Sequence, residues 1–144
     1  MIEFFSENDF QLQNSYAVIN WLSGIISSEE YTLGELSFVF CSDTYLHKIN
    51  LEFLNHDTLT DIISFDYSLG SEVHGEIYIS TDRVEENANE RNLEFIDELH
   101  RVMAHGVLHF CGYKDKTEEE VTTMRRKEEE ALELRKEYKE LKNS

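Results

Sequence analysis

The residues best suited to chemistry in this chain are His105 and His109, four positions apart in the segment HGVLHFCGYKD at 105–115. On a helix, side chains at i and i+4 lie one above the other on the same face. Two imidazoles placed in this way can share one tetrahedral zinc ion. The pair alone is weak evidence for a metal, because surface or capping histidines also occur at this spacing. The residues that follow the pair therefore decide the interpretation.

Gly112 and Asp115 strengthen the interpretation as a metal site. Gly112 stands where the helix must end, and glycine there can take the left-handed conformation that reverses the chain. The reversal can bring Asp115 back toward the histidines, which gives the pattern H-x3-H-x2-G-x2-D. Three protein ligands and one open position describe a catalytic zinc site. The alternative is that Asp115 caps the charged helix that follows, although Thr117 can serve as that cap instead.

The residue beside the first histidine argues against a protease. Metalloproteases of the zincin type have the motif H-E-x-x-H, in which the glutamate is the general base. This chain has Gly106 in the place of that glutamate. Its serines also lack the context of a nucleophile elbow, and it has no glycine-rich phosphate loop. We therefore identify no catalytic side chain and expect a metal-bound water to be the nucleophile.

The charge of the chain limits its partners. The formal net charge is −17, and residues 1–115 contain 21 acidic but only 5 basic side chains. Such a domain should not bind nucleic acid tightly and non-specifically, because phosphate neutralisation needs clustered Lys and Arg. It can attract cations or basic proteins. The one run of three basic residues is Arg125, Arg126 and Lys127.

The composition is that of a protein of the cytoplasm. No apolar segment is long enough to cross a membrane, and the acidic N-terminus does not read as a signal peptide. Cys41 and Cys111 form no C-x-x-C pair, so two reduced, mostly buried thiols are expected.

The pattern of apolar residues predicts one α+β domain over residues 1–144. We expect a small mixed sheet of about four strands, with helices packed mainly on one face. The alternation in GEIYIS at 75–80 suggests a strand with one wet face, and hence an edge strand. The other expected strands are at 2–5, 34–43 and 60–65. One helix is expected at 15–29, a second beginning at Ser42 or Asp43, a third from about 80 to 92 and a fourth beginning at about 94. A charged C-terminal helix is expected at about 118–142.

Three segments together resemble the YbeY family. The first is HGVLHFCGYKD, similar to an HGxLHLxGYDH-like segment whose three histidines bind metal in that family. The second is INLEFLNHDTLTDIISF at 49–65, which is similar to an LN…TNVLSF-like segment. The third is HGEIYIS at 74–80, which is similar to LGDIxIS. The resemblance runs through nearly the whole chain in order and size.

The resemblance implies a single-strand-specific, metal-dependent endoribonuclease. Members of the family act in maturation of the 16S rRNA 3′ end and in ribosome quality control. The family fold is related in outline to metzincin proteases, and zinc is usually assigned to the site. Carried to this chain, the resemblance gives one divalent ion, held by His105, His109 and Asp115. The expected partners are an rRNA precursor, the small ribosomal subunit and basic ribosomal proteins.

The chain departs from the family pattern at two positions. Asp115 replaces the third histidine; a carboxylate is an acceptable zinc ligand, but it should make the metal a weaker Lewis acid. Leu54 stands where the family usually has an arginine implicated in activity, and Leu59 stands at the place of a proline. A protonated His56 could replace that cation, although a solvated loop histidine is the simpler interpretation.

These departures keep other functions open. The basic run Arg125, Arg126 and Lys127 could hold RNA phosphates, or it could be a solvated helix face paired with the glutamates at 128–130. The first rival function is a non-catalytic ribosome-assembly factor with a structural metal, which the acidic charge favours. A metal-dependent hydrolase of small molecules is a weaker alternative.

Overall fold

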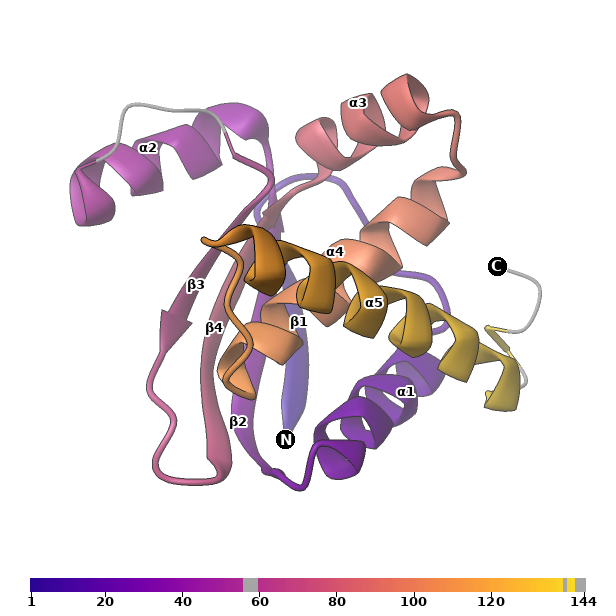
Figure 1. The fold of residues 1–144 in the computed structure, drawn as a ribbon. Helices are drawn as coiled ribbons and strands as arrows, with labels where there is room; N and C mark the ends of the chain where they lie inside the picture. Colours follow the sequence, from indigo (N-terminus) through magenta and orange to yellow (C-terminus); the bar gives the residue numbers. More distant parts are fainter. Residues whose placement is uncertain (56–59, 139, 142–144) are drawn as a thin grey trace.

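The computed structural model describes residues 1–55, 60–138, 140 and 141. A four-stranded sheet lies behind helices α1, α4 and α5, and α2 stands apart from these helices (Figure 1). The elements in chain order are β1 Ile2–Ser6, α1 Ser15–Ser28, β2 Thr32–Cys41, α2 Asp43–Leu54, β3 Ile62–Asp66, β4 Glu72–Ser80, α3 Thr81–Arg91, α4 Phe95–Phe110, α5 Glu118–Leu134 and a 3-10 turn at Arg135–Glu137.

The sheet is mixed, as predicted, with the strand order β1-β2-β4-β3. Strands β1, β2 and β4 are parallel, and β3 runs antiparallel to β4. The prediction of an edge position for 75–80 is wrong, because β4 lies between β2 and β3, and β1 and β3 are the two edge strands. The alternation in β4 has another cause: Ile77 and Ile79 face the main core, whereas Glu76 and Tyr78 face the less covered side of the sheet.

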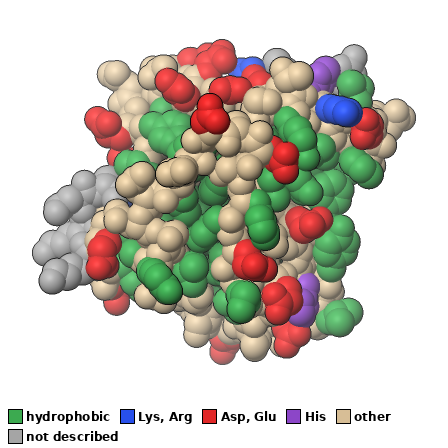
Figure 2. Space-filling view, turned by 180° about the vertical axis from the view of Figure 1, so that it is seen from behind, with side chains coloured by type: hydrophobic (Ala, Val, Ile, Leu, Met, Phe, Trp, Pro, Cys, Tyr) green, Lys and Arg blue, Asp and Glu red, His purple; other side chains and the backbone are tan. Residues whose placement is uncertain are grey.

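Most of the core lies on one face of the sheet. Alternate side chains of the strands, such as Phe38 and Ile77, meet Trp21 of α1 and Met103 of α4 there. The opposite face is covered only in part, by α2, whose Leu46 packs with Cys41 and Ile63 in a small second cluster. The expectation of helices mainly on one face is confirmed. Figure 2 shows the opposite side of the molecule, where Asp and Glu side chains are common and Lys and Arg are few.

Side-chain caps begin three of the helices. The hydroxyl oxygens of Ser42, Ser80 and Thr117 accept hydrogen bonds from the backbone N–H groups of Tyr45, Arg83 and Glu120, respectively. Each bond satisfies a backbone donor that has no partner within its own helix, and so fixes where that helix begins.

The C-terminal helix is shorter than predicted. Helix α5 ends at Leu134 rather than near 142, and one 3-10 turn follows it. The Arg135 side chain turns inward, where it donates to Asp97 and to the carbonyl of Leu132. After this turn, Tyr138 packs against the core and Leu141 is buried in it. Among the described residues, no helix has the length and apolar character needed to span a membrane.

Candidate metal centre

Helix α4 places His105 and His109 at the border of the core. Gly106, between them, faces the sheet so closely that a Cβ atom there would lie 2.9 Å from Ile77 Cδ1 and 3.0 Å from Ile62 Cδ1. The helix therefore lies tight against β3 and β4, and the two rings remain partly exposed beside it. Their Nε2 atoms are 3.0 Å apart.

The chain reversal after α4 brings Asp115 to the same point. Gly112 has φ = 97°, as predicted for a left-handed glycine. The N–H of Tyr113 bonds to the carbonyl of Leu108 and the N–H of Gly112 to that of His109, which together form a Schellman motif. Asp115 Oδ2 consequently lies 3.3 Å from Nε2 of both His105 and His109.

The spacing of these three atoms fits a metal ion. Zinc–nitrogen bonds of 2.0–2.1 Å in a tetrahedron separate neighbouring ligand atoms by about 3.3–3.4 Å. The observed separations, 3.0 and 3.3 Å, are close to that value. Within the described part of the chain, no other group of His, Cys, Asp and Glu side chains converges in this way.

Both imidazoles are held in the tautomer that a metal requires. His105 Nδ1 donates to Glu128 Oε2 at 2.6 Å, and His109 Nδ1 donates to the carbonyl of Tyr113 at 2.8 Å. Because the hydrogen of each ring is on Nδ1, the lone pair of each Nε2 points toward Asp115. A cation at that point would relieve the repulsion between the lone pairs. Such partners on the far ring nitrogen are typical of metal-binding histidines.

Asp115 is free to act as a ligand because another residue caps α5. Thr117 is the N-cap and forms a capping box with Glu120: the Thr117 hydroxyl accepts from the Glu120 N–H, and a Glu120 carboxylate oxygen accepts from the Thr117 N–H. The alternative that Asp115 caps this helix is therefore wrong.

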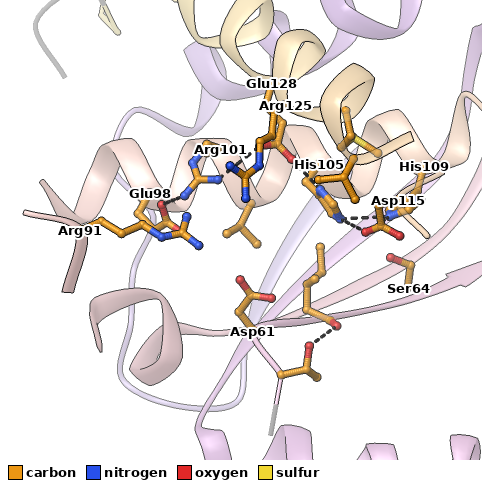
Figure 3. Close-up of a pocket in the computed structure, with 15 residues that line it drawn as sticks. Asp61, Ser64, Arg91, Glu98, Arg101, His105, His109, Asp115, Arg125 and Glu128 are labelled. Atoms are coloured by element: carbon orange, nitrogen blue, oxygen red, sulfur yellow. Dashed lines mark hydrogen bonds and ion pairs between the residues drawn. The ribbon is translucent and has the colours of Figure 1, made fainter. Parts of the chain in front are cut away.

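The candidate metal centre opens into a cleft of about 450 Å³ between α4, α5 and β3. In Figure 3, Asp61, the residue just before β3, points into this cleft opposite α4. The other side chains along the cleft are Thr60, Ile62, Ser64, Arg91, Glu98, Arg101, Val102, Val121, Met124, Arg125 and Glu128.

Burial and neighbouring charges shift the titration of several groups in the cleft. Burial lowers the pKa of His105, but the hydrogen bond and charge of Glu128, together with the charges of Asp115 and Asp61, outweigh it, so the net shift is upward. Burial raises the pKa of Asp61, and the charge of His105 offsets part of that shift. Burial also raises the pKa of Glu98 to about 7, against the opposing effect of Arg91.

The structure separates the three members of the basic run. Arg125 lines the cleft, whereas Arg126 is exposed and is not among the side chains that line it. Lys127 points elsewhere: its Nζ lies 3.1 Å from Glu29 Oε2 and 5.4 Å from the centre of the Tyr113 ring. His56 and Leu59 lie outside the described residues, and Leu54 borders a second hollow on the other side of the metal centre.

Sequence reasoning missed the supporting residues of the site. Arg101 and Glu98 precede His105 by four and seven positions, a helical spacing that could have identified them. From the sequence, Asp61 could orient a ligand or a water, but a turn or strand-capping role is the simpler interpretation of its position. Glu128 gave no comparable signal, because it follows His105 by 23 residues and reaches it only through the packing of α5 on α4.

Comparisons with known proteins point to one family. The sequence model of the family described as Endoribonuclease YbeY matches residues 4–136. A Christiangramia forsetii protein named Endoribonuclease YbeY is 61% identical over 133 residues, which are 92% of this chain and 93% of that protein. A Flavobacterium johnsoniae protein of the same name is 55% identical over 132 residues, 92% of this chain and 95% of that protein.

A solved structure has the same fold. The solution structure of TM1509 from Thermotoga maritima superposes with a TM-score of 0.70 at 27% sequence identity, and covers 100% of this chain and 97% of that one. The family match and the two relatives show the family, and the solved structure agrees in fold: the chain belongs to the family of the endoribonuclease YbeY.

Proposed function

We propose that this protein is a zinc-dependent endoribonuclease that cleaves single-stranded RNA. The observation that carries the proposal is the convergence of His105, His109 and Asp115. The Nδ1–H group of each histidine donates to a partner on the other side of its ring, so that both Nε2 atoms face Asp115. The name of the relatives, which describes an RNA-cleaving enzyme, supports the same activity. By its resemblance to the family, the protein acts in the cytoplasm, in 16S rRNA 3′-end maturation and ribosome quality control.

His105, His109 and Asp115 would hold one divalent ion, and a donor set of two imidazoles and a carboxylate suits zinc. When bound, such an ion supplies Lewis acidity, which lowers the pKa of water and polarises a phosphoryl oxygen. Glu128 and the Tyr113 carbonyl keep the two rings oriented. Asp61 faces the cleft and has a raised pKa, so it offers a proton acceptor for an attacking water.

The second candidate is a ribosome-assembly factor in which the metal is structural. The observation in its favour is the net charge of −17. The acidic surface in Figure 2 suits basic ribosomal proteins of the small subunit.

One experiment distinguishes the two candidates. Purified protein loaded with zinc is incubated with end-labelled single-stranded RNA and with the same RNA as a duplex, beside the His109→Ala variant. Cleavage of the single strand alone, lost in the variant, supports the nuclease. Absence of cleavage with any divalent ion, together with retained binding to small ribosomal subunits, would support the assembly factor.

A further inference from the structure

The cleft gathers arginines in a protein that is otherwise acidic. The chain has six arginines, and Arg91, Arg101 and Arg125 line this one cleft. They come from three different helices, α3, α4 and α5. Guanidinium groups that converge from separate elements suit an anionic ligand, because each can bind phosphate with two parallel hydrogen bonds.

The carboxylates of the cleft do not neutralise all three arginines. Arg101 is held by Glu98 and by Glu128, whose Oε1 lies 3.3 Å from Nη1. Arg91 makes one longer contact, 3.5 Å to Glu98, and its side chain is 50% exposed. Arg125 is exposed and forms no ion pair with any residue that the structure describes. Arg101 is thus a structural cation, while Arg91 and Arg125 remain available to a ligand.

The arginines all lie on one side of the metal centre. We call the part of the cleft lined by Arg91, Arg101 and Arg125 the arginine arm. Arg101 lies about one helical turn before His105 on α4 and Glu98 about two turns before it, so the arginine arm extends about 10 Å from the candidate metal ligands. In Figure 3, Arg91 lies at the far end of this arm and Arg125 beside Glu128. The hollow on the other side of the centre includes Asp66, Leu54 and Lys116, but its described lining contains no arginine.

We propose that the RNA strand leaves the metal centre along the arginine arm, and that Arg125 and Arg91 bind its backbone phosphates. This inference rests on the proposed endoribonuclease function and assigns its substrate contacts. Arg125 is the member of the basic run that takes part, and Arg126 and Lys127 do not. Contacts to phosphate carry no sequence information, so the two arginines position the strand without selecting its bases.

The neighbouring arginines of α5 provide a matched test. Arg125→Ala and Arg126→Ala remove the same charge from adjacent exposed positions of one helix. Binding is measured on metal-free protein by fluorescence anisotropy with a labelled single-stranded RNA, over a series of salt concentrations. We expect Arg125→Ala to weaken binding about tenfold and to reduce the salt slope by about one. Arg126→Ala should bind as the parent does, and Arg91→Ala combined with Arg125→Ala should lose more than Arg125→Ala alone.

Two further measurements complete the test: the rate of RNA cleavage by zinc-loaded protein, and the affinity of each variant for zinc. The Arg125→Ala variant should bind zinc as the parent does but cleave RNA more slowly at limiting substrate, and Arg125→Lys should restore much of the binding. Equal RNA affinities for Arg125→Ala and Arg126→Ala would overturn the assignment even if the parent cleaves RNA, as would a parent that does not bind RNA at all. A parent that binds through Arg125 but never cleaves would support the phosphate contacts and refute the nuclease.

Discussion

Glu128 and His105 are joined by a hydrogen bond of 2.6 Å, although 23 residues separate them in the chain. The bond ties α5 to α4 at the metal centre. Glu128 also holds Arg101, so one buried carboxylate orients a candidate metal ligand and fixes the first cation of the arginine arm.

This bond predicts that Glu128 contributes to metal affinity without being a ligand. Glu128→Gln removes the negative charge opposite His105 Nδ1, so we expect zinc affinity to fall by about tenfold or more. Isothermal titration calorimetry would measure it. Glu129→Gln, at the adjacent exposed position, is the control and should leave the affinity unchanged. Equal affinities for the two variants would show that Glu128 does not support the site.

Asp115 is predicted to be the third ligand. Asp115→Ala should lower zinc affinity steeply, because two imidazoles alone would remain. Asp115→His should restore much of the affinity, since imidazole is an equally suitable zinc donor. Calorimetry gives stoichiometry and affinity for both variants, and zinc binding by Asp115→Ala as tight as that of the parent would remove Asp115 from the ligand set.

Gly112 should matter for the metal as well as for the fold. Its φ of 97° is strained for any residue with a Cβ atom, so Gly112→Ala should reduce the free energy of unfolding by about 1 kcal/mol. Gly70, with φ = 59°, is the control, since it lies between β3 and β4 and is not among the residues that line the cleft. Both alanine variants should lose stability in urea denaturation, but only Gly112→Ala should also lose zinc affinity, because it disturbs the reversal that carries Asp115. Unchanged zinc affinity in Gly112→Ala would contradict this account.

Asp61 is predicted to assist cleavage as a proton acceptor. Asp61→Asn keeps the size of the side chain but removes the basic oxygen, so kcat for RNA cleavage should fall by about a hundredfold or more, while zinc affinity stays near that of the parent. Asp66→Asn, at the other end of β3, is the matched control. Parent-like kcat in Asp61→Asn would exclude the role.

His100 should make the protein sensitive to acid. Burial, and then the charge of Arg135, lowers its pKa from 6.5 to about 3. The folded state therefore holds this ring neutral, whereas the unfolded state takes up a proton below about pH 6.5. The stability due to His100 is complete above pH 6.5 and is lost as the pH falls toward 3, by up to about 1.4 kcal/mol per pH unit.

Urea denaturation of metal-free protein between pH 7 and 4 measures this effect. His100→Gln does not titrate, so its free energy of unfolding should fall less steeply with acid than that of the parent. Parallel pH profiles for the two proteins would assign the acid sensitivity to other groups.

The convergence of the three candidate ligands could be predicted from the sequence because it is local. His105 and His109 are one helical turn apart, and a single glycine controls the return to Asp115. The prediction of an edge position for 75–80 failed because alternating apolar and polar residues indicate that one face of the strand is only partly covered. They do not indicate where the strand lies in the sheet. The contact of Glu128 with His105, and the different directions of Arg125 and Lys127, depend on how α5 is rotated and docked on α4. Helical periodicity alone does not determine that docking. The end of α5 depends likewise on where the Arg135 side chain finds partners.

The place of Glu128 in the chain order affects when the metal centre matures during synthesis. A nascent chain that has left the ribosome as far as Asp115 already contains all three candidate ligands, but it lacks both the carboxylate that orients His105 and the arginine that would hold the substrate. Both arrive together on α5 and act only after that helix docks on α4. We therefore expect an unfinished chain to bind a metal ion weakly and, under the proposed endoribonuclease function, to leave the RNA around it uncut.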